Sequence, residues 1–155
     1  MKRWSMLVFA VALAATLTCR RPPAAIGAEE GWLTDFEQAR EQARQTGRPI
    51  LINFTGSDWC GWCKLLSKEV FSQPEFQSYA RDNLVLLVAD FPRRKTLPPE
   101  VAAQNHSLQA RFDVGGYPTI ILIDAYGTVL GRTGYRRGGP AAYVEHLREL
   151  LKGGG

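Results

Sequence analysis

The sequence has little histidine and little cysteine, which limits the metal and haem chemistry open to it. Two histidines and three cysteines occur among its 155 residues. Tetrahedral zinc takes four ligands, and the cysteines at 60 and 63 supply two. The residues left to complete a site are Cys19, His106 and His146, none with a partner at metal spacing. Covalent haem attachment needs a histidine directly after the second cysteine, where this chain has a lysine. The spacing alone leaves zinc open, but the composition disfavours it and we expect no metal.

The apolar run near the N-terminus is too short to cross a bilayer as a helix. It extends from Met6 to about Leu17 and follows positive charges at residues 2 and 3. This order is typical of a secretory signal peptide, and the small residues at 24–28 offer a cleavage site. We therefore predict a signal peptide over 1–28 and export to the periplasm. An uncleaved membrane anchor is the alternative, because the arginines at 20 and 21 oppose translocation.

Cys19 closes this apolar run, at the place where bacterial lipoproteins are cleaved and acylated. The residues before it, Thr16-Leu17-Thr18, fit the usual lipobox poorly. A lipid anchor on Cys19 therefore stays open as a second alternative, with the leader ending just before that cysteine. In either case the folded part would face an oxidising compartment.

The formal net charge of +4 and the pI near 9.1 are moderately basic. Four of the basic residues belong to the leader, and two short clusters, Arg93-Arg94-Lys95 and Arg136-Arg137, stand out in the remainder. Such short runs are typical of solvated loops, so we predict no nucleic-acid partner. The length fits one domain, which we place at 29–152, followed by a disordered tail at 153–155.

Two thiols lie three residues apart in Trp59-Cys60-Gly61-Trp62-Cys63-Lys64. If Cys60 opens a helix, Cys63 lies one turn further on the same face, within reach of a disulfide. Backbone N–H groups and the positive end of the helix dipole would lower the pKa of the Cys60 thiol, and Lys64 adds a positive charge nearby. The predicted chemistry is thiol–disulfide exchange, in which Cys60 attacks a disulfide and Cys63 resolves the mixed disulfide.

Apolar periodicity predicts alternating helices and strands, and hence an α/β fold. Helices are expected at 31–45, 60–71, 74–81, 99–112 and 140–151, and strands at 50–54, 84–90, 120–123 and 128–131. Thr34 or Asp35 should cap the first helix, with Trp32 on its apolar face and Gly47 as its stop. The strand at 50–54 is a short apolar run apart from Asn53, which suits burial on both faces of a sheet. Its carboxyl end leads to the two thiols, where open α/β sheets place their sites.

A second motif, Gly116-Tyr117-Pro118-Thr119, immediately precedes the strand expected at 120–123. An X–Pro bond adopts the cis form far more readily than other peptide bonds, and a fixed cis-proline is usually a turn or functional feature. By itself this signal is weak, because only about 5–6% of X–Pro bonds in folded proteins are cis and the chain has nine prolines.

Trp-Cys-Gly-x-Cys-Lys at 59–64, together with Gly-Tyr-Pro-Thr at 116–119, resembles the paired motifs of the thioredoxin superfamily over roughly 31–152. The resemblance implies a thioredoxin fold, with a central mixed sheet of about four to five strands flanked by helices. The Gly-Ser-Asp-Trp-Cys loop at 56–60 is similar to that of exported thioredoxin-like proteins related to the C-terminal domain of the DsbD disulfide reductase.

Carried over to this chain, the resemblance implies that Cys60 is the exposed nucleophile and Cys63 the buried resolving thiol. Pro118 would be the cis-proline facing the disulfide, and the backbone of Tyr117 would pair with an extended substrate segment. Further substrate contacts are expected from Trp59, Gly61 and Trp62. Packing is the alternative role of the two tryptophans.

Two positions depart from thioredoxin. Trp62 replaces the proline that thioredoxin has between its cysteines, so we do not carry over the thioredoxin potential. Asn53 replaces the buried acid that helps thioredoxin deprotonate its second cysteine, and an amide cannot act as a base. Proton transfer from Cys63 would then use water or another group, with Asp90 as one candidate.

The predicted function is that of an exported thiol–disulfide oxidoreductase acting on disulfides in protein substrates, supplied with electrons by a membrane partner of the DsbD type. A monomer is expected, with no cofactor beyond the redox-active Cys60–Cys63 disulfide. Two alternatives stay open: a peptide-binding module that keeps the fold without turnover, and a dedicated thiol reductant for cytochrome c maturation.

Overall fold

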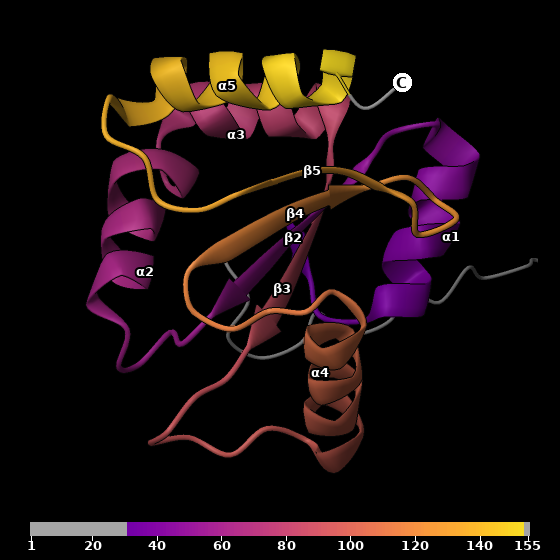
Figure 1. The fold of residues 1–155 in the computed structure, drawn as a ribbon, viewed down its shortest axis with the longest axis vertical. Helices are drawn as coiled ribbons and strands as arrows, with labels where there is room; N and C mark the ends of the chain where they lie inside the picture. The colour runs from indigo at the N-terminus through magenta and orange to yellow at the C-terminus, as the bar shows by residue number, and fades with distance from the viewer. Residues whose placement is uncertain (1–30, 154–155) are drawn as a thin grey trace, which may run out of the picture.

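The structure is a computed structural model in which residues 31–153 are described. Its centre is a five-stranded sheet in the order β1-β3-β2-β4-β5, with helices on both faces (Figure 1). The strands are β1 (Trp32–Leu33), β2 (Ile50–Thr55), β3 (Val85–Asp90), β4 (Thr119–Ile123) and β5 (Val129–Thr133). The helices are α1 (Phe36–Thr46), α2 (Gly61–Leu66), the π-helix η1 (Ser67–Phe71), α3 (Pro74–Asn83), α4 (Pro99–Arg111) and α5 (Gly139–Gly153). The mixed sheet flanked by helices confirms the predicted fold class.

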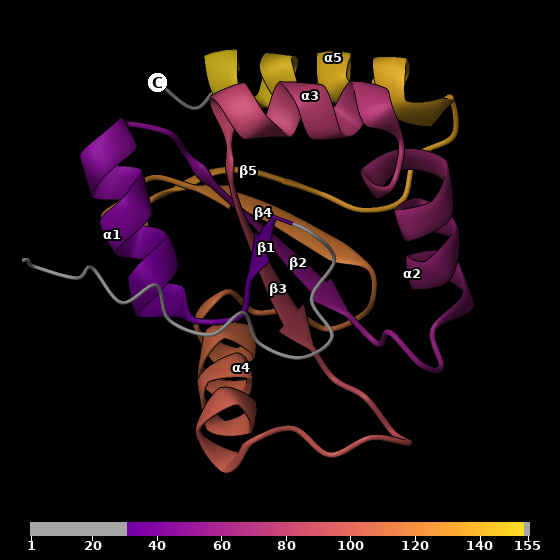
Figure 2. The ribbon, with the colours of Figure 1, turned by 180° about the vertical axis from the view of Figure 1, so that it is seen from behind.

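The central strand β2 pairs in parallel with β3 and antiparallel with β4. Ile52 and Phe54 point to the face covered by α1 and α4, whereas Leu51 points to the face covered by α2, α3 and α5 (Figures 1 and 2). Burial on both faces explains why four of the first five residues of β2 are apolar. Asn53 shares the face of Leu51, because side chains alternate along a strand. Asn53 and Thr55, which lie on the same face, are the two polar residues of β2.

The first helix begins later than predicted, because Trp32 and Leu33 form the short strand β1. They pair in parallel with Leu86 and Leu87 of β3. Trp32 packs its ring against Phe71, with 5.2 Å between ring centroids, instead of lying on a helix face. The backbone partners offered by the edge of β3 therefore replace the predicted first helical turn.

The two ends of α1 carry the predicted signals. The carboxylate of Asp35 accepts a hydrogen bond from the N–H of Gln38 at 2.9 Å, which identifies Asp35 as the cap. The helix ends at Gly47, whose φ of 69° lies in the left-handed region that glycine adopts at little cost. The predicted stop is therefore confirmed.

The helix that follows the two thiols changes character after Leu66. Its continuation, Ser67–Phe71, is π-helical, a form found mostly as single turns and often next to functional sites. The later elements match the prediction within a few residues, except that α5 extends through Gly153, which was expected to begin the tail.

The predicted leader at 1–28, with Cys19, and residues 154–155 lie outside the described residues. Among the helices within 31–153, none has the length and apolar character that crossing a bilayer requires.

Candidate active site

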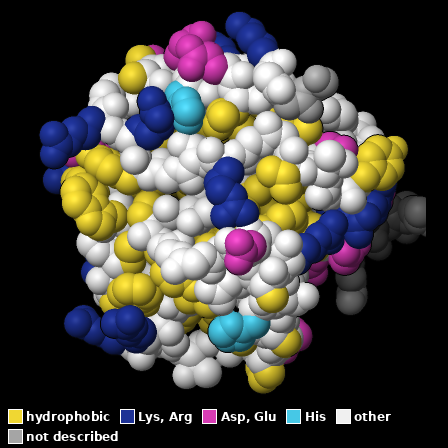
Figure 3. Space-filling model, viewed as in Figure 1, with side chains coloured by type: hydrophobic (Ala, Val, Ile, Leu, Met, Phe, Trp, Pro, Cys, Tyr) yellow, Lys and Arg dark blue, Asp and Glu magenta, His cyan; other side chains and the backbone are white. Residues whose placement is uncertain are grey.

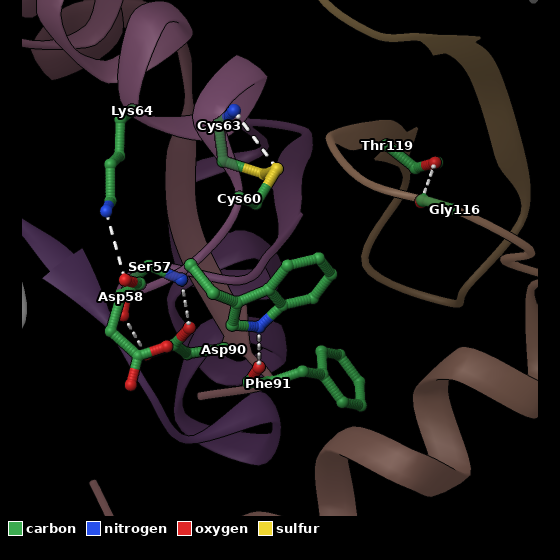
Figure 4. Close-up of a disulfide and its surroundings, with 10 residues drawn as sticks. Ser57, Asp58, Cys60, Cys63, Lys64, Asp90, Phe91, Gly116 and Thr119 are labelled. Carbon is green, nitrogen blue, oxygen red and sulfur yellow. Dashed lines mark hydrogen bonds between the residues drawn. A yellow bond between two sulfur atoms is a disulfide. The ribbon is translucent and has the colours of Figure 1, made fainter. Parts of the chain in front are cut away.

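The two predicted thiols form a disulfide at the carboxyl end of β2, where α2 begins (Figure 4). The Cα atoms of Cys60 and Cys63 are 5.3 Å apart. Cys60 has extended backbone angles and caps α2, and its Sγ accepts a hydrogen bond from the N–H of Cys63 at 3.2 Å. The predicted placement of one cysteine at the start of a helix and the other one turn later is confirmed.

The two cysteines differ less in solvent exposure than we predicted. Cys60 is 6% exposed and Cys63 is 5% exposed. In the disulfide each sulfur covers part of the surface of the other, so the expected contrast between an exposed and a buried thiol is small. Position still distinguishes them, because Cys60 precedes the helix whereas Cys63 lies within it.

The loop before Cys60 is shaped by a close approach of Trp59 to Gly56. A Cβ atom on Gly56 would lie 2.4 Å from the indole ring, so only glycine fits at this position. The backbone N–H of Cys60 donates to the carbonyl of Gly56 at 2.8 Å. The indole N–H of Trp59 donates to the carbonyl of Phe91 at 2.8 Å, which joins this loop to the end of β3 (Figure 4).

Asp58 fastens the same loop to the chain after β3. Its carboxylate accepts the backbone N–H groups of Arg93, at 3.0 Å, and Arg94, at 2.7 Å. These hydrogen bonds, with that of Arg93 the largest cause, lower the pKa of Asp58. The guanidinium of Arg93 also lies 3.8 Å from the centroid of the Trp59 ring, a cation–π contact.

Lys64, predicted to tune the thiol, points from α2 toward Asp58 rather than toward the sulfurs (Figure 4). Its ammonium group donates to the carbonyl oxygen of Asp58 at 3.0 Å. This geometry ties the helix to the loop that precedes the disulfide. An effect of Lys64 on the Cys60 thiol stays a prediction.

The Tyr117–Pro118 peptide bond is cis, as the resemblance to the thioredoxin superfamily implied. The ring of Tyr117 makes an edge contact with Trp59, at 5.8 Å between centroids, and a tilted contact with Phe91, at 5.2 Å. Its hydroxyl accepts a hydrogen bond from Gln109 at 2.8 Å, and burial raises the pKa of Tyr117. Because Trp59 precedes Cys60 and Tyr117 precedes Pro118, this contact brings the two sequence motifs together.

Trp62 is 55% exposed and lies on the outer surface of α2. Its ring packs against Tyr135, in the segment between β5 and α5, at 5.2 Å between centroids. The Tyr135 hydroxyl donates to a carboxylate oxygen of Glu69 at 2.8 Å, and this bond raises the pKa of Tyr135. Trp62 is therefore held by a neighbour but presents most of one face to solvent.

A cavity of about 460 Å³ lies on the inner side of the disulfide, with Asn53, Cys63 and Asp90 among the residues that line it. The side-chain oxygen of Asn53 is buried and accepts no hydrogen bond from the described part of the chain. Asp90 accepts hydrogen bonds from the N–H of Ser57 at 2.9 Å and from its hydroxyl at 2.6 Å. The ammonium of Lys95 lies 3.0 Å from the same carboxylate. Cys63 therefore lines the same cavity as the Asn53 side-chain oxygen and the Asp90 carboxylate, which Ser57 and Lys95 hold in place.

A family model described as thioredoxin-like matches residues 31–125. The chain belongs to this thioredoxin-like family. The disulfide bond reductase DsbH of Chlamydia pneumoniae is 38% identical over 76% of this chain and 70% of its own length. The thiol:disulfide interchange protein DsbD of Cronobacter sakazakii is 32% identical over 97% of this chain, but the match spans only 27% of DsbD. The solved structure of a DsbH oxidoreductase has a TM-score of 0.77 and 38% identity, and covers 88% of this chain and 92% of that one.

This thioredoxin-like chain is a thiol–disulfide oxidoreductase, since it combines the family fold, similarity to a disulfide reductase and a Cys60–Cys63 pair that forms a disulfide. Among residues 31–153, no group of three or more His, Cys, Asp or Glu side chains is placed to hold a metal ion.

Sequence reasoning did not find three neighbours of the site: Phe91, Arg93 and Tyr135. The sequence showed Arg93 as part of a basic cluster, and we interpreted that cluster as part of a solvated loop. Its contact with Trp59 depends on how two separate loops meet, which no local pattern in the sequence records.

Proposed function

We propose that this protein is exported and reduces or exchanges disulfides in other exported proteins, with Cys60 as the attacking sulfur. The observation that supports this most is the Cys60–Cys63 disulfide at the start of α2, beside the loop that carries cis-Pro118. The cysteine that caps a helix is the one whose thiolate the backbone N–H groups stabilise. Here the N–H of Cys63 already points at the sulfur of Cys60.

The reaction transfers two electrons to the substrate. The thiolate of Cys60 attacks one sulfur of the substrate disulfide, so that a mixed disulfide forms and one substrate thiolate leaves. The thiolate of Cys63 then attacks the sulfur of Cys60, which forms the intramolecular disulfide and releases the second substrate thiolate. The protons of the two protein thiols end on the two substrate thiols, and the protein is left oxidised.

The second step requires a proton acceptor for Cys63, and Asn53 cannot serve. We propose that Asp90 takes this proton through water in the cavity that Asp90, Asn53 and Cys63 line. Its carboxylate is the acid held in place there, by Ser57 and Lys95. The orphan oxygen of Asn53 supports a water in this cavity, because a buried polar atom needs a partner.

The substrates and the electron source are proposals from similarity. The relatives are a disulfide bond reductase and a thiol:disulfide interchange protein. We propose that this chain works as a monomer, receives electrons from a membrane donor of the DsbD type, and needs no cofactor beyond its own disulfide. The backbone of Tyr117 would pair with the substrate, and Trp59, Gly61 and Trp62 would contact it.

Reduction of insulin by dithiothreitol, followed by turbidity, tests the activity. The protein should accelerate this reduction, and a Cys60→Ser variant should not. Absence of any acceleration that depends on Cys60 would refute the proposal. The reduction potential of the Cys60–Cys63 couple then gives the direction, with about −270 mV indicating a reductase like thioredoxin and about −120 mV an oxidant like DsbA.

A further inference from the structure

Basic side chains gather around the disulfide. Segment 57–69 holds both cysteines, segment 90–95 contacts Trp59, and segment 134–139 contacts Trp62 through Tyr135. Together these three segments contain seven Lys or Arg residues and three Asp or Glu residues. The rest of the described chain has eight basic and ten acidic residues. The positive excess of the folded part therefore lies at the site, while the remainder of the described chain is slightly acidic.

The first cluster, Arg93-Arg94-Lys95, is fastened to the loop that precedes Cys60. Arg93 lies over Trp59, and the backbone N–H groups of Arg93 and Arg94 bind the Asp58 carboxylate. Lys95 pairs with Asp90. The guanidinium groups of Arg93 and Arg94 are exposed, and no salt bridge engages them within residues 31–153.

The second cluster, Arg136-Arg137, follows Tyr135, whose ring packs on the exposed Trp62. Both arginines are exposed, and neither takes part in an ion pair of the described chain. Each tryptophan of the motif therefore has a basic segment at its side. Figure 3 shows Lys and Arg side chains above and below hydrophobic side chains at the left margin, on the side where α2 lies in Figure 1.

The three acids of this region offset three of its seven positive charges and leave a net excess of four. Asp58 is bound by backbone N–H groups, Asp90 by Ser57 and Lys95, and Glu69 by the Tyr135 hydroxyl. Their hydrogen-bonding capacity is used within the protein. No salt bridge within residues 31–153 engages the guanidinium groups of either cluster, so they can donate to an incoming ligand.

We propose that these four arginines select protein substrates whose cystine is flanked by acidic residues. The proposal rests on the proposed reductase function and names the class of substrate for that same site. An extended segment advances about 3.3 Å per residue, so side chains one to three residues from the attacked cysteine lie within about 10 Å of it. The two clusters adjoin the tryptophans next to the cysteines, and exposed charges attract one another over a screening length of about 8 Å at physiological salt, so carboxylates at these positions would be attracted by the arginines.

Two cyclic peptides test this proposal. Each contains one disulfide in the same ring, flanked in one peptide by glutamates and in the other by lysines. Reduced protein is mixed with each peptide in a single turnover followed by tryptophan fluorescence, since Trp59 and Trp62 adjoin the cysteines. Each rate is divided by the rate with dithiothreitol, a neutral thiol, which removes the effect of the flanking charges on the intrinsic reactivity of the disulfide.

We expect the acidic peptide to react about tenfold faster than the basic one at low salt, and the preference to shrink to about twofold near 0.5 M salt. Arg136→Glu with Arg137→Glu should remove most of this preference, and Arg136→Gln with Arg137→Gln about half of it. The matched control is Arg44→Glu with Lys152→Glu, which changes the net charge equally on the side of the molecule away from α2 (Figure 1). This control should keep the preference.

The outcomes separate the inference from the function on which it rests. Turnover of neither peptide would overturn the reductase proposal and the inference with it. Equal rates for the two peptides, or a faster basic peptide, would overturn only the inference. Equal rates together with arginine-dependent sedimentation on vesicles of anionic lipid would assign the two clusters to a membrane surface instead.

Discussion

On its outer side the Cys60–Cys63 disulfide is flanked by segments that carry aromatic rings and arginines, whereas on its inner side it borders a cavity whose lining includes the polar side chains of Asn53 and Asp90. The outer groups come from α2 and from loops far apart in the sequence, with Trp59 against Tyr117 and Trp62 against Tyr135. The inner groups come from neighbouring strands, with Asn53 on β2 and Asp90 on β3. We infer that recognition of the substrate and handling of the proton are separated on opposite sides of one bond.

Because of this separation, mutations on one side should leave the role of the other side intact. A change on the outer side should alter which disulfides react, and how tightly they bind, without altering how the mixed disulfide is resolved. A change on the inner side should do the reverse. The variants below are ordered by the size of the effect that we expect.

Removing either sulfur should have the largest effect and should divide the reaction into its two steps. Cys60→Ser should lower the rate of insulin reduction by at least about a thousandfold, because the attacking thiolate is lost. Cys63→Ala should attack but fail to resolve, so mixed disulfides should accumulate and be visible by mass spectrometry after non-reducing electrophoresis. A Cys63→Ala variant that traps no partner in a periplasmic extract would argue for a binding module in place of a catalyst.

On the inner side, Asp90→Asn should slow resolution of the mixed disulfide by about a hundredfold and leave the first attack unchanged. The amide keeps the shape of the side chain but cannot take the proton of Cys63. Quenched-flow measurement of the mixed disulfide separates the two steps. Ser57→Ala is the control, because it removes a hydroxyl bound to Asp90 and leaves the carboxylate. Equal slowing of attack and resolution would show that Asp90 only holds the loop.

The sequence predicted those parts of the fold and of the site that local patterns determine. The apolar run of β2, the stop at Gly47 and the cap at Cys60 each depend on a few adjacent residues. The sequence-based prediction was wrong where residues far apart in the sequence determine the structure. Trp32 was assigned to a helix because the edge of β3 that pairs with it lies far along the chain.

The outer side of the disulfide illustrates the same limit. The hydrogen bond from Trp59 to Phe91 joins residues 32 positions apart in the sequence, and that from Tyr135 to Glu69 joins residues 66 positions apart. A pattern in one stretch of sequence carries no information on such pairs. The sequence therefore predicted both cysteines and the cis-proline, but not the neighbours that position the two tryptophans.

At the base of the outer side, Gly56→Ala should lower the free energy of unfolding by about 1–3 kcal/mol, as overpacking typically does. The new methyl group would meet the Trp59 indole at 2.4 Å, so the ring must move and give up its bond to Phe91. Urea denaturation measures the loss, and Gly61→Ala is the control because a Cβ there meets nothing within 4 Å. Equal stability of the two variants would contradict the close packing of Trp59.

Trp62→Ala should raise the KM for a peptide disulfide about threefold to tenfold and leave kcat nearly unchanged. The ring is 55% exposed, so its loss removes contact area for the substrate more than it removes core packing. Steady-state kinetics at several peptide concentrations distinguish the two constants. A fall in kcat with constant KM would show that Trp62 acts in resolution of the mixed disulfide, and would contradict the proposed separation of substrate recognition from proton transfer.

The smallest effect should come from Asp58→Asn, which weakens the joint between the loop before Cys60 and the chain that carries Arg93. Hydrogen bonds from the N–H groups of Arg93 and Arg94 hold the pKa of Asp58 below its ordinary value of 3.8. A lowered pKa means that the carboxylate stabilises the folded state at any pH above about 4 and stops doing so as pH falls through the lowered pKa. The difference in Tm between wild type and Asp58→Asn should therefore be small and constant from about pH 7 to pH 4.5, and should shrink below about pH 3.8. A difference that changes between pH 7 and 4.5 would mean that another group, and not this carboxylate, holds the outer loops together.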